Sequence, residues 1–357
     1  MNVAIRVDAS PLIGTGHVMR CLTLADALKQ RGAQVRFISR HMPEHLQDIL
    51  IARGHELARV DSGVREAAID GTSHAHWLDT SQRADAQDTI RVLSDQAWDW
   101  LIVDHYALDA RWESALRRNA NNILIIDDIA ERPHDCDMLL DQNLHIDMRS
   151  RYAGRVPDDC GLLLGPHYAL LRQEFRQLRG RVKPRTGVIR RVLISFGGVD
   201  AGNCTARAVE ALAGLELPSL QVDVVVGAQN PFRERIGCVC AEHGFLVHVQ
   251  TDRMAELMAA ADLAVGAGGS ASWERCCVGL PALVVSQSDS ECEIATGLDR
   301  HGGCIHLGSA SIAGVPAIRN AIEKLFDNRD VVAALSEHAY SLVDGLGDAR
   351  VCERLRQ

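Results

Sequence analysis

Short apolar runs alternate with amphipathic segments along the whole chain. In the first half such runs lie at residues 3–7, 35–39, 101–104 and 123–127, and in the second half at 191–196, 222–226, 245–249, 263–265 and 282–285. Between them, segments such as 17–30 have helical spacing. Continuous apolar runs separated by helices are typical of parallel strands covered on both faces. We therefore predict an α/β fold.

The alternation stops once and then restarts. Residues 176–191 are rich in arginine and include Gly180, Pro184 and Gly187. This composition predicts an interdomain linker with solvated charges. We accordingly expect an N-terminal domain at 1–175, a second domain at 192–335 and a C-terminal helical segment at 336–357. Two tandem α/β halves suggest an enzyme with its ligand between facing strand ends.

Composition narrows the function classes. A net charge of -9 argues against a phosphate-backbone binder, and 4% aromatic residues argue against a stacking platform for single strands. The first apolar run is short and meets Arg6 and Asp8, unlike a signal peptide, and no apolar run is long enough for a membrane span. We expect a cytoplasmic, small-molecule enzyme, a monomer or weak homodimer, with no nucleic-acid or membrane partner.

The spacing of the cysteines does not predict a zinc site. The chain has 11 cysteines, and no pair is separated by two residues as in common zinc motifs. Reduced buried thiols are the simpler interpretation. We expect neither a metal nor a cofactor.

The first loop of chemical interest, residues 8–20, joins a strand to a helix. Gly14 and Gly16 would let backbone amides approach a ligand. A dinucleotide fingerprint would need a glycine or alanine where Met19 stands and an acid near 35–39, so we exclude NAD. His17 starts the helix, whose dipole disfavours imidazolium. A neutral His17 could take a proton from water; alternatively it caps the helix or packs.

Two later glycine loops also follow strands. Gly197 and Gly198 either expose amides to a phosphate or sugar, or form an ordinary tight turn. The loop with Gly268, Gly269 and Ser270 offers several amides and a hydroxyl, which suits a diphosphate.

Acidic residues accompany these loops. Glu274, one turn into the following helix, could hold ribose hydroxyls or simply complement the helix dipole. Asp104, Asp127 and Asp128 end strands, where acids either face the ligand crevice or cap the next helix.

Taken together, these motifs resemble the UDP-sugar hydrolases of the pseudaminic acid pathway. The similar segments are 7–10, 14–22, 104–106, 136–137, 165–172, 196–200 and 266–270, in order within residues 1–305. The resemblance implies two Rossmann-like parallel-sheet domains facing across a cleft, the GT-B type. It also implies that the N-terminal domain holds the sugar and the C-terminal domain holds UDP.

The resemblance further implies the reaction and its residues. Water would displace UDP from the anomeric carbon of a 2,4-diacetamido-2,4,6-trideoxyhexose, the β-L-altropyranose, by inverting C–O cleavage without a metal. His17 would be the general base, Tyr106 would lie beside the sugar, and Arg172, Glu274 and the 266–270 loop would contact the nucleotide. The implied substrate-binding residues are Asp8, Gly14, Gly16, Tyr106, Arg172, Gly197, Gly198, Gly268, Gly269, Ser270, Glu274, Ser290 and Glu291.

One departure keeps alternatives open. Ser290 and Glu291 stand where the family usually has an Asn-Gln pair that reaches the substrate. An amide can donate to a phosphate, whereas a carboxylate would repel it. The alternatives are a glycosyltransferase of the same fold with a hydroxyl acceptor, and a non-catalytic sugar-nucleotide sensor or scaffold.

Overall fold

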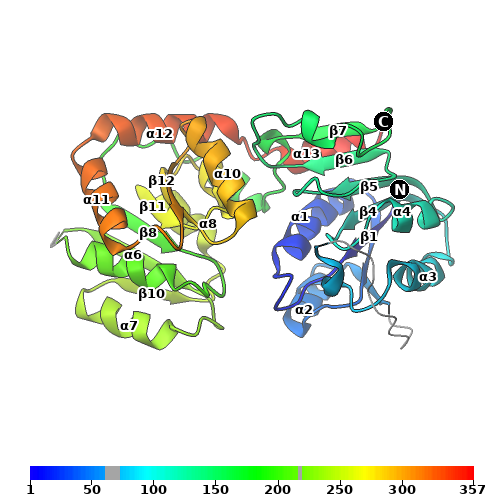
Figure 1. The fold of residues 1–357 in the computed structure, drawn as a ribbon, viewed down its shortest axis with the longest axis horizontal. Coiled ribbons are helices and arrows are strands. Elements are labelled where there is room, and N and C mark those ends of the chain that lie inside the picture. Colours follow the sequence, from blue (N-terminus) through cyan, green and yellow to red (C-terminus); the bar gives the residue numbers. More distant parts are fainter. Residues whose placement is uncertain (61–72, 216–218) are drawn as a thin grey trace. The chain divides into compact units, whose positions relative to one another are not determined.

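A computed structural model of the protein describes residues 1–60, 73–215 and 219–357. The chain forms two compact units, which we call unit 1 and unit 2. Unit 1 comprises Met1–Asn143, Asp147–Arg172 and Leu346–Gln357; unit 2 comprises Leu144–Ile146 and Gln173–Gly345. Figure 1 shows a sheet with flanking helices in each unit.

Unit 1 is built on a seven-stranded parallel sheet in the order β3-β2-β1-β4-β5-β6-β7. Its strands are β1 (Asn2–Val7), β2 (Gln34–Ser39), β3 (Glu56–Arg59), β4 (Trp98–Asp104), β5 (Ala120–Ile126), β6 (Met138–Asp141) and β7 (Gly161–Leu164). Its helices are α1 (Gly16–Gln30), α2 (Glu44–Ala52), α3 (Gln82–Leu93), α4 (Ala110–Leu116) and α13 (Gly347–Arg354), with short 3-10 turns at Ala75–Trp77, Ser150–Tyr152 and Pro166–Tyr168.

Alternate strand residues of this sheet enter two separate cores. Ile5 and Ile102 pack with α1, α2 and α13 on one face. Ala4 and Leu101 pack with α3 and α4 on the other face. Both faces are thus covered, which is why the strands read as continuous apolar runs.

Unit 2 repeats the design with a six-stranded parallel sheet in the order β10-β9-β8-β11-β12-β13. Its strands are β8 (Arg191–Ser195), β9 (Gln221–Val226), β10 (Leu246–Val249), β11 (Leu263–Gly266), β12 (Ala282–Ser286) and β13 (Ile305–Ser309). Its helices are α5 (Gln173–Arg179), α6 (Cys204–Ala213), α7 (Arg233–Glu242), α8 (Met254–Ala260), α9 (Ala271–Cys277), α10 (Asp289–Arg300), α11 (Val315–Phe326) and α12 (Arg329–Leu342). The predicted α/β class with two parallel sheets is therefore confirmed.

Both sheets reverse their strand order once. The reversal falls between β1 and β4 in unit 1 and between β8 and β11 in unit 2. Loops at the carboxyl ends of strands flanking such a reversal form the usual ligand crevice of open α/β sheets. The loops after β1 and β4, and those after β8 and β11, occupy this position in their own units.

The unit boundaries differ from the predicted ones. Residues 176–191 were predicted to be a solvated linker, yet they belong to unit 2, which takes up the chain at Gln173. Within this stretch, Arg185 donates to the carbonyls of Met258, Ala259 and Ala261 at the carboxyl end of α8. Helix carboxyl ends attract cations because their carbonyls are unpaired. Arg185 therefore has a structural role that composition did not reveal.

The predicted C-terminal segment 336–357 is also divided. Its first part completes α12 in unit 2, whereas Leu346–Gln357, with α13, belongs to unit 1. There Trp100 Nε1 donates to the Leu355 carbonyl at 2.9 Å. No helix in the described ranges is long and apolar enough to cross a bilayer.

Candidate functional site

His17 is the second residue of α1, at the carboxyl edge of the unit 1 sheet, and is 9% exposed. Its Nδ1 lies 2.6 Å from Asp104 Oδ1, at the end of β4. Because a carboxylate only accepts, Nδ1 carries the proton and donates it. The other ring nitrogen, Nε2, has no hydrogen-bond partner within the described part of the chain, and in this tautomer it is a proton acceptor.

Asp104 is held ionised by its surroundings. It accepts hydrogen bonds from Arg20 Nε at 2.6 Å and Arg20 Nη2 at 2.7 Å. Burial would raise the pKa of Asp104, but the charge of Arg20 and the hydrogen bonds from Arg20 and His17 lower it well below its ordinary range. An ionised Asp104 can orient the His17 ring and stabilise the imidazolium that forms when His17 accepts a proton.

The same arginine extends the network to Tyr106. Arg20 Nη1 pairs with Asp128, and Tyr106 donates its hydroxyl to Asp128 at 2.7 Å. Burial, together with the charge of Asp128, raises the pKa of Tyr106 well above its ordinary value. Tyr106 therefore remains a neutral phenol beside His17, with its ring 4.7 Å away and edge-on.

Trp77 and His74 complete an aromatic cluster around His17. Trp77 stacks on Tyr106 with ring centroids 5.5 Å apart, and its ring lies 6.1 Å from that of His17. His74 packs edge-on against both Trp77 and Tyr106. Such rings form an apolar wall that suits the carbon face of a sugar or an acetyl methyl group. Sequence reasoning missed Trp77 and His74, which lie in no glycine loop or strand end.

Asp8 requires a correction. It was predicted to bind substrate, but its side chain is fully buried. It pairs with Arg6 and His105 and accepts from Ser39 Oγ at 2.9 Å and Arg40 N at 2.7 Å. Burial opposes its ionisation, but Arg6 and His105 lower its pKa well below the ordinary value. Asp8 supports the loop that begins at its own position, and its side chain is not exposed at the surface.

Gly14 lies in the loop before α1 and Gly16 is the first residue of α1, and both are exposed. Gly14 has a φ of 79° and donates to the Ser10 carbonyl, while Ser10 Oγ accepts from Leu12 N and Ile13 N. The positive φ favours glycine at position 14. No side chain caps α1, so its first amides remain available beside His17.

Asp127 has a structural role, unlike Asp104 and Asp128. It is buried and pairs with Arg132 Nη2 at 2.5 Å, and His134 Nε2 lies 3.7 Å away. His134 also pairs with buried Glu113 at 2.7 Å. Burial opposes a charge on His134, but Asp127 and Glu113 outweigh it and raise the pKa of His134 to about 9. Because Arg132 also donates to the Tyr106 carbonyl, this cluster supports the Tyr106 loop from behind.

In unit 2, Gly197 and Gly198 form an exposed turn after β8. Gly197 has a φ of 85°, and a Cβ on the neighbouring Gly227 would lie 1.9 Å from the Gly198 carbonyl oxygen. The following Asp200 caps α6 by accepting from Cys204 N and Thr205 N. This turn is therefore compact and leaves its glycines open to solvent.

The loop after β11 has unpaired amides. Within the described residues, the N–H groups of Gly268, Gly269 and Ser270 donate to no protein acceptor. Ser270 is exposed, and its hydroxyl does not cap α9. Gly268 is buried and Gly269 half-buried, and consecutive amides without a protein acceptor can bind an anion. Glu274 lies half-buried in α9, and Arg172 is the last residue of unit 1 before α5.

Glu291, from the first turn of α10, lies against this loop. Its Oε2 accepts from Gln287 N at 2.8 Å, and a Cβ on Gly269 would lie 3.3 Å from its Oε1. Ser290 is exposed, and its hydroxyl lies 3.1 Å from that of Ser288, which caps α10. A carboxylate is thus fixed beside the free amides. Gln287, which sequence reasoning missed, donates its amide to the Phe196 carbonyl and joins the loops after β8 and β12.

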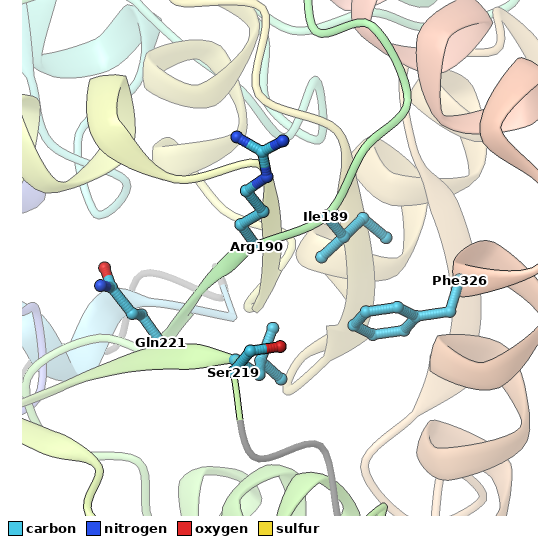
Figure 2. Close-up of a pocket in the computed structure, with 6 residues that line it drawn as sticks. Ile189, Arg190, Ser219, Gln221 and Phe326 are labelled. Carbon is cyan, nitrogen blue, oxygen red and sulfur yellow. The ribbon is translucent and has the colours of Figure 1, made fainter.

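A separate cavity lies at the opposite end of the unit 2 strands. It measures about 370 Å³ and is lined by residues around the starts of β8 and β9 and the end of α11. Figure 2 shows Ile189, Arg190, Ser219, Gln221 and Phe326 around it. None of the predicted site residues lines it.

The described residues contain no group of three or more His, Cys, Asp or Glu side chains that could hold a metal ion.

Solved structures with the same architecture identify the fold. MurG of Acinetobacter baumannii matches with a TM-score of 0.68 and 16% identity, covering 100% of this chain and 99% of that one. The protein has the GT-B fold. A UDP-GlcNAc 2-epimerase from Neisseria meningitidis, solved bound to UDP-GlcNAc, matches with a TM-score of 0.62 and 12% identity over 100% of both chains. At these identities the likeness establishes the fold alone.

Sequence relatives of this GT-B protein are distant. It is 24% identical over 260 residues to the UDP-2,4-diacetamido-2,4,6-trideoxy-beta-L-altropyranose hydrolase of Campylobacter jejuni, covering 72% of this chain and 81% of the relative. It is 22% identical over 356 residues to the spore coat polysaccharide biosynthesis protein SpsG of Bacillus subtilis, covering 98% and 96%. An uncharacterised protein of Methanocaldococcus jannaschii is 20% identical over 300 residues, and the match spans 82% of this chain and 57% of that protein. No family model matches.

Proposed function

We propose that this protein hydrolyses a UDP-activated 2,4-diacetamido-2,4,6-trideoxyhexose, most simply the β-L-altropyranose, to UDP and the free sugar. The observation that carries the proposal is the His17–Asp104 pair, which leaves His17 Nε2 as a proton acceptor at the carboxyl edge of the unit 1 sheet. The similarity to the Campylobacter jejuni hydrolase supports the choice of reaction and substrate.

The proposed chemistry needs one base and a stabilised leaving group. Water attacks the anomeric carbon through an oxocarbenium-like state while its proton passes to His17 Nε2. The anomeric C–O bond breaks with inversion, and its electron pair leaves on the UDP oxygen. Ionised Asp104 stabilises the imidazolium as it forms.

Each unit offers groups that suit a different part of the substrate. In unit 1, the Trp77–Tyr106 wall suits the sugar and its acetamido methyl groups. In unit 2, the free amides of Gly268, Gly269 and Ser270 suit the diphosphate, and Gly197 and Gly198 offer further backbone contacts. Arg172 and Glu274 would contact the nucleotide, as the family resemblance implies.

The test is an NMR time course of the UDP-sugar with purified protein and no acceptor. We expect free sugar to appear first as the inverted anomer. His17→Gln should slow its release roughly 10²–10⁴-fold. His45→Gln, the same exchange at an exposed position in α2, should leave the rate unchanged. Full turnover by the His17 variant would refute the general-base assignment.

A glycosyltransferase is the second candidate, because MurG and other glycosyltransferases share the fold. It would release UDP only when a hydroxyl acceptor is added. A non-catalytic sensor is the third candidate, suggested by the carboxylate of Glu291 beside the free amides. It would bind the UDP-sugar without consuming it in the same time course.

A further inference from the structure

Arg275 lies beneath the glycine loop of unit 2 and is 3% exposed. From α9 its Nη2 donates to the Ala267 carbonyl at 2.7 Å and to Ser272 Oγ at 2.9 Å. A Cβ on Gly266 would lie 3.1 Å from its Nη1 and 2.5 Å from the Ser195 carbonyl oxygen. The glycine at 266 thus leaves room for a guanidinium directly behind the loop.

The hydrogen bonds of this guanidinium go to uncharged groups. Both of its acceptors are neutral, and no carboxylate in the described part of the chain forms an ion pair with it. Burial lowers the pKa of Arg275, and the charges of Glu274 and Glu291 partly offset that effect. An arginine nevertheless stays protonated in proteins, so the site retains a buried cation without an ion-pair partner among the described residues.

Arg185, in the same unit, has a guanidinium charge that neighbouring groups stabilise. No carboxylate among the described residues forms an ion pair with it either, but it donates to a group of carbonyls that includes the carboxyl end of α8, where the helix dipole is negative. Arg275 has one carbonyl and one hydroxyl instead. Arg275 lies behind the free amides of residues 268–270, so its positive charge would add to the attraction that those amides exert on an anion.

We propose that Arg275 is the electrostatic determinant of diphosphate selectivity, with the ligand's diphosphate supplying the counter-charge that the fold omits. This inference rests on the proposed nucleotide function. Arg275 does not touch the ligand; it acts through the loop above it, as a positioning residue. Its charge should strengthen binding of UDP but not of uridine, because uridine is neutral.

The experiment measures dissociation constants of UDP and uridine by calorimetry in wild type and three variants. Arg275→Gln keeps a polar side chain but removes the charge, and Arg275→Lys keeps the charge. Arg190→Gln removes an exposed charge at the other end of β8 and is the matched control. Thermal unfolding of each variant without ligand reports folding.

We expect Arg275→Gln to reduce the preference for UDP over uridine by about tenfold or more. Arg275→Lys should keep this preference within about threefold, and Arg190→Gln should not change it. An unchanged preference in Arg275→Gln, or equal losses of UDP and uridine affinity, would overturn the inference and leave Arg275 a purely structural residue.

A second measurement uses wild-type protein alone, in case the Arg275 variants do not fold. Inorganic pyrophosphate should raise the unfolding temperature of the wild type more than orthophosphate does at equal ionic strength. No such rise would contradict the inference. If UDP selectivity depends on Arg275 but the UDP-sugar is not hydrolysed, the inference stands and the hydrolase proposal fails. If the wild type binds neither UDP nor uridine, both fail.

Discussion

Replacing Asp104 by Asn tests whether the carboxylate acts through His17. Asparagine keeps the shape of the side chain but removes the charge that faces Nδ1 at 2.6 Å. Opposite charges about 4 Å apart interact by about 4 kcal/mol at an effective dielectric of about 20. If this stabilises the imidazolium only in the transition state, the loss in kcat is roughly 10³-fold.

The assay is a double-mutant cycle with His17→Ala on the UDP-sugar hydrolysis rate. Once His17 is removed, Asp104→Asn should slow the reaction by less than about threefold, because its effect requires the imidazole. Asp104 also pairs with Arg20, so the variant should lose about 3–5 kcal/mol of stability. Rates are therefore compared at a temperature where circular dichroism shows every variant folded.

Additive losses would refute this reasoning. If the double variant is slowed by the product of the two single effects, Asp104 acts independently of His17. If Asp104→Asn retains wild-type turnover, the pair does not take part in the reaction.

Three further predictions follow from other contacts. Glu291→Gln should tighten UDP binding about threefold to tenfold, because it removes a negative charge beside Gly269. Calorimetry measures this change. Weaker binding would show that the carboxylate contacts the ligand favourably. Arg185→Ala should lower the free energy of unfolding of unit 2 by roughly 2–4 kcal/mol in urea titrations, because several carbonyls at and near the end of α8 lose their donor. A change under about 0.5 kcal/mol would contradict the structural role of Arg185. The pKa of His134 is about 9 in the folded protein and about 6.5 in the unfolded chain. His134 should therefore stabilise the fold by up to about 3 kcal/mol, in full below pH 6.5, and this stabilisation should be lost as the pH rises through 9. His134→Gln should abolish this dependence, and equal pH slopes in both proteins would contradict it.

The candidate site was only partly predictable. The loops of His17, Gly197 and Gly268 were predicted from local spacing, since a glycine turn between strand and helix is written in consecutive residues. Asp104 was recognised only as a strand-end acid with two possible roles, because its partner lies 87 residues away. Asp8 was assigned to the ligand through the family resemblance, and the sequence does not show that its side chain is buried.

For the fold, the sequence by itself determined the α/β class and the succession of two α/β halves, because parallel strands buried on both faces must be apolar throughout. It did not reveal the short strands β3, β6, β7 and β13, or the return of residues 346–357 to unit 1. Strand order, the burial of Arg275 and the pairing of His17 with Asp104 were decided by tertiary structure alone. Each depends on contacts between segments distant in the chain, whereas hydrophobic periodicity records only which side of its own element a residue faces.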